Sequence, residues 1–550
     1  MKTPGEGRWR RLLVAIAMTA CLVAAVAGSG SAGAAGAKPK TLRALFASFP
    51  DYLDPQLSYT NEGWNAMYDV YVPLLTFRHA DGEGGMEVVP GLAQSLPTVT
   101  DGGRTYTLYL RPGLRYSDGT RVRATDFEYA VKRLYRLFSG GSPFYTVIVG
   151  AKKFARTRRG GISGITADDA TGRIVIHLNR PSSTFTQLLA VPFAAPVPQT
   201  TPMHELFFRP APATGPYEIL PLGRGDGWTY VRNPAWKNGR QPLPEVPRGF
   251  VDRIEVEVVR DPEEEVKRVL SGEAHWMQNP PPPSRFAALR RHFEGTRLRV
   301  DPVPSTYYFW MNTRKPPFDD LRIRQAANYA VDTAALEAIY GGQLTASHQI
   351  LPPGMPGYEQ FNLYPYDLAT ARRLVAEADP ADRQITVWTD TESPNEEAGI
   401  YFAGQLRKIG LRVELKTLNS DNYFTVIGRR KTPHLDAGWS DWFADFPHPD
   451  DWFRPLLRGA SILPTNNGNF AKIAAPRLDA QIEALSRAPL DPTAESAYAA
   501  LDRAFMERAP WVPYGTRTLA TFVSKTVDLE GVVFNPMFGA DMASFKFKGG

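Results

Sequence analysis

The stretch Thr306–Val331, T-Y-Y-F-W-M-N-T-R-K-P-P-F-D-D-L-R-I-R-Q-A-A-N-Y-A-V, predicts the unit around which the fold is built. Its first part, Tyr307–Met311, is an unbroken apolar and aromatic run that is too short for a helix, and it is typical of a strand buried on both faces. Pro316-Pro317 ends this strand, because proline has no backbone N–H to donate. One acid of Asp319-Asp320 is then expected to cap a helix by accepting the free N–H groups of its first turn.

The helix predicted after this cap has a narrow apolar face. Its apolar residues recur at i, i+3, i+4, i+7 and i+8, namely Ile323, Ala326, Ala327, Ala330 and Val331. Because most of them are small, we expect the helix to pack closely against its neighbour. A strand followed by a helix is the repeating unit of an α/β layer.

The run Asn312–Asp332, N-T-R-K-P-P-F-D-D-L-R-I-R-Q-A-A-N-Y-A-V-D, resembles the most characteristic segment of the family 5 extracellular solute-binding proteins. These proteins are the peptide- and nickel-binding components of ABC importers. Further segments similar to the family are P-G-L-A at 90–93, Y-S-D-G at 116–119, T-D-F at 125–127, T-G-P-Y at 214–217 and R-N-P at 232–234. The resemblance runs from about Thr41 to Lys548. It implies an α/β fold of the two-lobed, periplasmic-binding-protein-like kind, type II, with an extra subdomain in the first lobe.

The resemblance also implies a division of the chain. We expect an export signal at 1–37, the first lobe at 38–79 and 187–300, its extra subdomain at 80–186, the second lobe at 301–508, and a return to the first lobe at 509–550. No low-complexity linker follows residue 40, so we expect the domains to be interleaved.

Length and charge exclude several classes of protein. A chain of 550 residues is too long for one hydrophobic core, so at least two domains are expected. The net charge is +6, but four basic residues and one acid within 1–37 account for +3 of it. The remaining charge is spread along the chain, which argues against nucleic-acid binding. The densest basic segment, Lys152–Arg159, is expected to be a solvated loop.

The N-terminus has the layout of an export signal. Basic residues up to Arg11 precede the apolar run Leu12–Ala27, and small residues follow as far as Ala37, where we expect cleavage. Cys21, the sole cysteine, offers an alternative as the lipid-attachment residue of a lipoprotein. Cleavage is favoured because the apolar run continues beyond Cys21. Either way we expect a protein in the periplasm or on the extracellular cell surface, without a disulfide in its mature fold.

Several local patterns predict individual elements. Thr125–Glu128 is typical of a capping box at the start of a helix. Leu53-Asp54-Pro55 resembles an early family segment at the edge of the binding cleft, and by itself it indicates a turn. Further strands, a hairpin and a strand–helix–strand unit are predicted at 41–46, 105–110, 254–258, 165–178 and 385–415.

The stretch Gly438–Phe453, G-W-S-D-W-F-A-D-F-P-H-P-D-D-W-F, carries the candidate binding residues. Aromatic and acidic residues alternate too closely for one helical face, so we expect a loop or strand end that forms a cleft wall. In peptide-binding family members the acid of the matching W-x-A-D-[YF] pattern pairs with the α-amino group of the ligand. The resemblance assigns that role to Asp445, with Trp442 beside it. An enclosed ammonium group requires such a carboxylate.

Three further residues complete the predicted site. Asp441 is a rival anchor, while Trp439 and Phe446 offer aromatic faces to apolar or cationic groups. The alternative interpretation is that the tryptophans of this stretch, including Trp452, belong to the core. His448 occupies a position where family members often have an acid.

Catalytic and metal chemistry find little support. The eight histidines show no metal-ligand spacing, and the chain has neither a G-x-S-x-G nor a phosphate-loop motif. We therefore expect no catalytic residue, cofactor or metal. The expected partners are a peptide and the membrane permease of an ABC transporter, with a monomeric chain and no nucleic acid. Nickel complexes, sugars or another small solute are alternative ligands, and a sensing receptor or an extracellular hydrolase is an alternative function.

Overall fold

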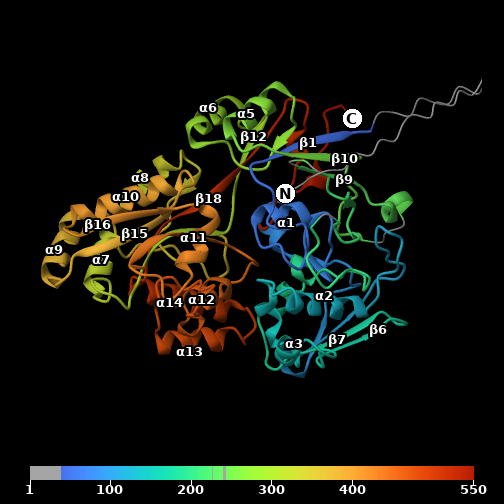
Figure 1. The fold of residues 1–550 in the computed structure, drawn as a ribbon, viewed down its shortest axis with the longest axis horizontal. Coiled ribbons are helices and arrows are strands. Elements are labelled where there is room, and N and C mark those ends of the chain that lie inside the picture. Colours follow the sequence, from blue (N-terminus) through green and yellow to red (C-terminus); the bar gives the residue numbers. More distant parts are fainter. Residues whose placement is uncertain (1–38, 208, 224, 226, 240–242, 550) are drawn as a thin grey trace, which may run out of the picture. The chain divides into compact units, whose positions relative to one another are not determined.

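A computed structural model describes residues 39–549, except 208, 224, 226 and 240–242 (Figure 1). The predicted export signal, with Cys21 and the cleavage site near Ala37, lies outside these residues. In the described part of the chain, no helix combines the length and the apolar character needed to cross a membrane.

Strand β13 (Ser305–Met311) is buried at every residue, as the sequence predicted. It lies between two antiparallel neighbours, β17 (Ala437–Phe443) and β18 (Trp511–Val523). The helix that follows, α7 (Leu321–Tyr329), is capped by Asp320, whose carboxylate accepts the backbone N–H of Arg322 at 2.8 Å. The small-residue face of α7 is buried, so the unit predicted from residues 306–331 is confirmed.

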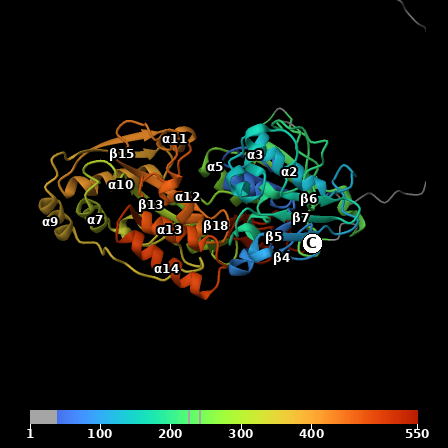
Figure 2. The same cartoon turned by 90° about the horizontal axis from the view of Figure 1, so that it is seen from below.

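The predicted strand–helix–strand unit lies beside β17. It consists of β15 (Gln384–Asp390), α10 (Asn395–Lys408) and β16 (Arg412–Leu418), and the two strands are parallel. Helix α9 (Leu368–Ala378) packs against α7. We call β13, β15, β16 and β17 the β13 half of the sheet; their helices cover them in both views (Figures 1 and 2).

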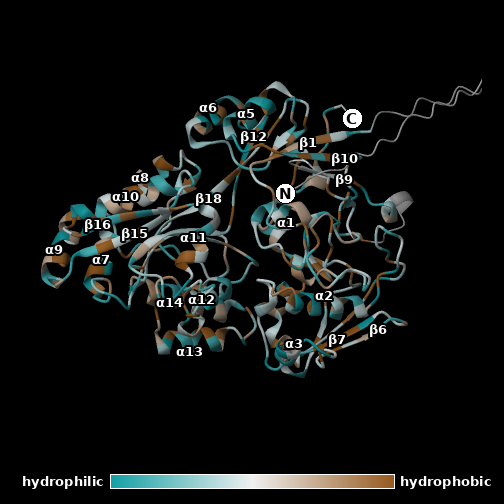
Figure 3. Cartoon of the chain, viewed as in Figure 1, coloured by the Kyte–Doolittle hydropathy of each residue, from teal (hydrophilic) through white to brown (hydrophobic). Residues whose placement is uncertain are grey.

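A second group of strands forms the β1 half of the sheet. Strand β1 (Thr41–Phe46) runs parallel to β10 (Arg253–Val258) on one side and to β11 (Trp276–Met277) on the other. Strands β9 (Gly227–Arg232) and β8 (Tyr217–Ile219) continue the sheet beyond β10. Apolar residues, brown in Figure 3, occupy these strands, while helices such as α9 carry both colours, as amphipathic helices do.

Strand β18 belongs to both halves. Its residues 511–515 pair with β13, and its residues 518–523 pair with β11 and with β12 (Leu298–Pro302). The result is one twelve-stranded sheet in which strands far apart in the sequence are neighbours. The exact domain boundaries remain predictions.

A separate four-stranded sheet has the order β4-β5-β7-β6. It contains β4 (Thr98–Thr100), β5 (Thr105–Tyr109) and the predicted hairpin of β6 (Ile165–Asp168) with β7 (Arg173–His177). Helix α2 (Thr125–Arg136) packs beside β6, and α3 (Ala151–Thr157) packs against α2.

The fold also has other α-helices and short strands, as well as a 3₁₀ helix close to the C-terminus. They are α1 (Asn61–Tyr68), β2 (Leu75–Phe77), β3 (Val88–Pro90), α4 (Phe185–Leu188), α5 (Pro262–Ser271), α6 (Pro283–Phe293), α8 (Thr333–Ile339), β14 (Leu344–Thr345), α11 (Ser420–Ile427), α12 (Asp450–Leu456), α13 (Pro476–Leu485), α14 (Pro492–Met506), β19 (Phe534–Asn535), β20 (Gly539–Ala540) and the 3₁₀ helix η8 (Met542–Ser544).

Two local predictions are wrong. The capping box does not form, because the Thr125 hydroxyl donates to Asp169 and the Glu128 carboxylate accepts the backbone N–H of Ile162. Both side chains therefore bond to residues outside the helix and do not cap its first turn. The segment Lys152–Arg159 is mostly helix α3 rather than a loop, because Ala151 and Phe154 bury one face; its lysines are exposed, as predicted.

Candidate functional site

The predicted site lies where β17 ends. After Phe443 the backbone N–H of Ala444 donates to the carbonyl of Pro304, and a short loop leads to α12 at Asp450. The expected strand end and loop are therefore present. The last predicted residues, Trp452 and Phe453, differ from the expectation, since they lie in helix α12.

Asp445 is buried in this loop, with 8% of its surface exposed. Its Oδ2 atom accepts a hydrogen bond of 2.7 Å from the Tyr59 hydroxyl, which comes from the loop before α1. Burial raises the pKa of Asp445 to about 7, although the bond from Tyr59 acts in the opposite direction. The carboxylate is thus costly to keep ionised in the absence of a cation.

Asp451, in the first turn of α12, supports this loop. Its Oδ2 atom accepts the backbone N–H of Asp445 at 2.8 Å and the indole N–H of Trp442 at 3.2 Å. Burial, followed by the neighbouring charge of Asp445, raises the pKa of Asp451 well above its usual value. Neither carboxylate forms an ion pair with any lysine, arginine or histidine in the described part of the chain.

Asp441 lies in a different environment from Asp445. It is half-buried on β17, opposite Tyr307 of β13. Burial first, and then the charges of Asp390 and Glu392 near the end of β15, raise its pKa to about 7. The two rival anchors are therefore both costly to ionise, but Asp441 faces other acids and Asp445 faces the Tyr59 hydroxyl.

The tryptophans of the stretch have unequal surroundings. Trp439 is buried and donates its indole N–H to the Tyr514 hydroxyl at 2.8 Å, and Trp452 is buried and donates to Thr306 at 3.0 Å. Both therefore lie in the core, as the alternative interpretation held. Trp442 is only half-buried and holds Asp451.

Phe446 belongs to an aromatic cluster that surrounds the Tyr59–Asp445 pair. Its ring lies edge-on to Phe144, with the ring centres 6.0 Å apart. The Tyr59 ring contacts Phe144, Phe193 and Trp64 at centre separations of 6.2, 5.2 and 5.9 Å. We call these five residues the aromatic cluster; they come from the loop before α1, from α1, from the region of the four-stranded sheet and from the loop after β17.

His448 carries no charge at this site. Burial and the neighbouring Arg454 lower its pKa to about 3, and its Nδ1 atom accepts the backbone N–H of Asp450 at 3.1 Å. The Asp450 carboxylate pairs with Arg454 at 2.7 Å. Both residues are buried, and the Asp450 carboxylate already has a cationic partner.

Sequence reasoning missed two participants, because nothing in the sequence singled out Tyr59 or Asp451. Asp54 begins a turn, as Leu53-Asp54-Pro55 indicated, since its carbonyl accepts the backbone N–H of Leu57. Its side chain is fully buried and binds Arg133 of α2 through both carboxylate oxygens, at 2.9 and 2.8 Å. Proximity between segments so distant in the sequence leaves no local pattern.

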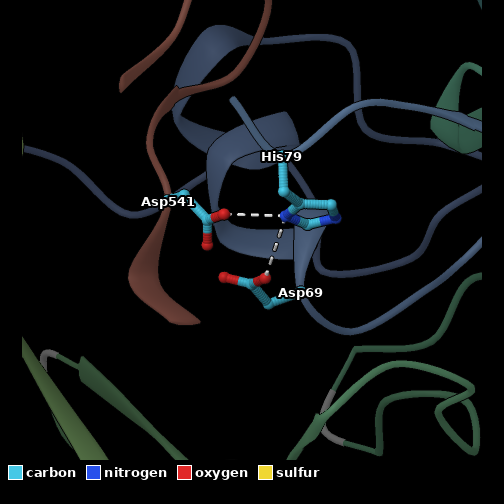
Figure 4. A group of neighbouring side chains, drawn as sticks. All are labelled: Asp69, His79 and Asp541. Carbon is cyan, nitrogen blue, oxygen red and sulfur yellow. Dashed lines mark hydrogen bonds and ion pairs between the residues drawn. The ribbon is translucent and has the colours of Figure 1, made fainter. Parts of the chain in front are cut away.

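A second group of polar side chains lies apart from these residues. Asp69, His79 and Asp541 place one nitrogen and two carboxylate oxygens within 4.8 Å of one another (Figure 4). This is the type of donor set that holds a metal ion.

Comparison with known proteins gives a consistent result. Residues 87–462 match the family model described as "Bacterial extracellular solute-binding proteins, family 5 Middle". The chain is 27% identical over 531 residues to heme-binding protein A of Haemophilus influenzae, covering 90% of each chain. It is 26% identical over 469 residues to the glutathione-binding protein GsiB of Salmonella typhi, covering 82% of this chain and 85% of that protein.

Among solved structures, the chain is similar to clavulanic acid biosynthesis oligopeptide binding protein 2. The TM-score is 0.81 at 25% identity, covering 92% of this chain and 95% of that one. The predicted fold class, a two-lobed α/β solute-binding fold of type II, is confirmed.

Proposed function

We propose that this chain, which belongs to the family 5 bacterial extracellular solute-binding proteins, captures oligopeptides outside the cytoplasm and delivers them to the permease of an ABC importer. One observation carries the proposal. Two buried carboxylates, Asp445 and Asp451, lie beside each other without a cationic partner among the described residues. The α-ammonium group of a peptide would supply the missing positive charge.

The energetics favour Asp445 as the group that receives this charge. A buried carboxylate is destabilised unless it is paired, and its raised pKa measures that cost. Tyr59 supplies a single hydrogen bond to one oxygen, Oδ2. An ammonium group would add a charge-assisted bond, which is about twice as strong as a neutral one. Asp451 holds the backbone of Asp445 and thereby fixes its position.

Asp441 remains the alternative anchor in this proposal. The raised pKa of Asp441 shows that a cation would stabilise its ionised form. The neighbouring acids Asp390 and Glu392 would compete with Asp441 for the same cation. We rank it second because these neighbouring acids oppose its ionisation, whereas Asp445 accepts a bond from the Tyr59 hydroxyl and the acid beside it, Asp451, is held by the backbone N–H of Asp445.

Aromatic side chains would form the walls around the ligand. Trp442 and Phe446 lie next to Asp445, and Phe144 faces Phe446 from another part of the chain. Such faces accept apolar side chains, and also cations through the quadrupole of the ring. Trp439 would support this wall from behind, because its indole is directed to Tyr514.

Delivery requires a conformational signal, and the bond from Tyr59 to Asp445 suggests one. Tyr59 lies in the predicted first lobe (38–79) and Asp445 in the predicted second lobe (301–508). A ligand that contacts both lobes only when they are together shifts the equilibrium toward the closed state. We propose that the permease recognises this state.

The family assignment supports an exported protein that binds solutes rather than one that catalyses a reaction. We propose that the export signal is cleaved near Ala37, with lipid attachment at Cys21 as the alternative, and that the protein acts as a monomer. A similar structure is that of an oligopeptide binding protein and a relative binds glutathione, a tripeptide; both support a peptide ligand.

Mass spectrometry of ligand released from the purified protein tests this function directly. We expect peptides in the released fraction, and calorimetry with those peptides should give saturable binding with one ligand per chain. A protein that releases no peptide, and binds none from a mixed peptide library, would contradict the proposal.

Heme is the second candidate, because heme-binding protein A is similar over 90% of the chain. The same purified protein, incubated with hemin and freed of excess, should show a shifted Soret band if heme binds. Saturable heme binding without peptide binding would favour this candidate over the first.

A further inference from the structure

Three side chains from distant parts of the sequence converge outside the site described above. Asp69 follows α1, His79 follows β2, and Asp541 precedes η8 (Figure 4). The His79 Nδ1 atom lies 2.7 Å from Asp541 Oδ2 and 4.0 Å from Asp69 Oδ1. All three side chains are at most 5% exposed.

The carboxylates are held in place by the backbone. Asp69 Oδ2 and Asp541 Oδ1 both accept the N–H of Ala543 at 2.9 Å. Each acid therefore uses one oxygen as a structural anchor and directs the other at the imidazole. Supporting bonds of this kind orient the ligands of metal sites.

One of the two inward oxygens has no partner. Asp69 Oδ1 is buried and receives no hydrogen bond, although the side chain is only 1% exposed and points toward His79 (Figure 4). A buried carboxylate oxygen without a partner is destabilising unless a cation or a hydrogen-bond donor satisfies it. In the described part of the chain, neither acid pairs with a lysine or an arginine.

We propose that Asp69, His79 and Asp541 bind one divalent transition-metal ion, for which Zn²⁺ is the representative. One imidazole nitrogen and two carboxylate oxygens match the ligands of zinc, whereas calcium and magnesium prefer oxygen alone. Ligands about 2.1 Å from a tetrahedral ion lie about 3.4 Å apart. The present separations of 2.7 and 4.0 Å lie on either side of that value, so small side-chain rotations suffice.

The ion would fasten the C-terminal segment to the region around α1. This junction already contains bonds from the Asn65 side chain to the carbonyls of Phe538 and Ala540, at 2.7 and 2.9 Å. Because Asp69 and Asn65 flank the C-terminal half of α1, the ion would stabilise the helix that begins next to Tyr59. The sequence predicted no metal site, since the three ligands show no common spacing.

Zinc binding to the full chain tests the proposal. The protein carries a purification tag without histidines, is stripped with EDTA, and is titrated with ZnCl₂ by calorimetry. We expect one ion per chain, a rise in melting temperature, and imidazole scattering in the zinc X-ray absorption spectrum. Absence of saturable binding to the stripped protein would overturn the proposal and leave a hydrogen-bonded Asp–His–Asp group only.

Two variants separate this site from incidental binding. Asp69→Asn keeps an acceptor for Ala543 but removes the inward charge, and it should weaken zinc binding roughly 10- to 100-fold or more. His292→Gln, at an exposed position of helix α6, should bind zinc as the natural protein does. Equal affinity in the two variants would overturn the assignment. If Asp69→Asn fails to fold, the zinc X-ray absorption spectrum of the natural protein tests the assignment instead, and a spectrum without imidazole scattering would overturn it.

Discussion

The Tyr59 hydroxyl donates a 2.7 Å hydrogen bond to the Asp445 carboxylate, although 386 residues separate them in the sequence. The bond joins the loop before α1 to the loop after β17. Its acceptor is the residue proposed to receive the ligand's ammonium group, so the Tyr59 hydroxyl and the ligand share one carboxylate. This arrangement leads to several of the following predictions.

Asp445→Asn should weaken peptide binding by about 2–5 kcal/mol, because the amide cannot compensate an enclosed ammonium group. Calorimetry measures this as at least roughly a 30-fold loss of affinity. Asp382→Asn, an exposed acid in the same predicted lobe, is the matched control for the change in net charge and should bind normally. Equal affinity in the Asp445 variant and the control would remove Asp445 from the site.

Peptide affinity should depend on pH below neutrality. The pKa of Asp445 is raised to about 7 in the unliganded protein, so protonation competes with the ligand as pH falls below that value. Affinity should therefore drop by up to about tenfold per pH unit below 7 and should also fall above about pH 8, where the peptide amine loses its proton. We call the fall in affinity below pH 7 the acidic limb, and the Asp445→Asn variant should lose it. An unchanged acidic limb in this variant would show that another group titrates.

Tyr59→Phe should move that acidic limb to higher pH. The hydroxyl stabilises the ionised carboxylate, and its removal raises the pKa of Asp445 further. The pH at which affinity is half its maximum reports this shift. Because the Tyr59 ring is 37% exposed, the fold itself should lose no more than about 1 kcal/mol in urea unfolding. A limb that stays in place would mean that Tyr59 does not act on Asp445.

Asp441→Asn should stabilise the protein at alkaline pH. The pKa of Asp441 in the folded state, about 7, exceeds the value near 4 of an unfolded chain, so its contribution lowers the free energy of unfolding as pH rises from about 4 to 7. The asparagine side chain of the variant does not ionise, so the variant does not lose this free energy of unfolding as pH rises. Because Asp441 is only partly exposed and solvent screens part of its charge, we expect a gain of about 1 kcal/mol at pH 8 and almost none at pH 4. Urea unfolding at both pH values measures it, and a loss at pH 8 would contradict the assignment.

Arg133→Met should destabilise the fold by about 3–5 kcal/mol, because it leaves the fully buried Asp54 carboxylate without its partner. The double variant Asp54→Leu, Arg133→Met should regain much of that loss, since neither charge then remains buried. Guanidinium unfolding of the single and double variants gives both values. A single variant that unfolds like the natural protein would show that water or another donor satisfies Asp54.

The sequence predicted those parts of the fold that depend on local patterns. The run 307–311 favoured a buried strand, because five consecutive apolar and aromatic residues before Pro316-Pro317 are too few for a helix. Asp320 caps α7 because its short carboxylate reaches the free N–H groups that follow it. Thr125–Glu128 shows the limit of this reasoning: the same local pattern gave no cap, since Asp169 and Ile162 offered better partners.

The candidate site was predictable only in part. The acids and aromatic residues of 438–453 were visible as a cluster, but burial divided them, leaving Trp439 in the core and Trp442 beside Asp451. Tyr59 could not be found, because a single tyrosine before a helix cap has no distinguishing pattern. The Asp69–His79–Asp541 group was equally hidden, since 462 residues separate His79 from Asp541.

Strand β18 sets the order in which the protein can be assembled. It supplies a neighbour to β13 in one half of the sheet and to β11 and β12 in the other, and it follows all three of them in the sequence. Until β18 has folded, β13 and β11 therefore each have one edge without a partner strand. Unpaired edges invite aggregation, so the folding chain exposes two such edges until residues 511–523 are in place.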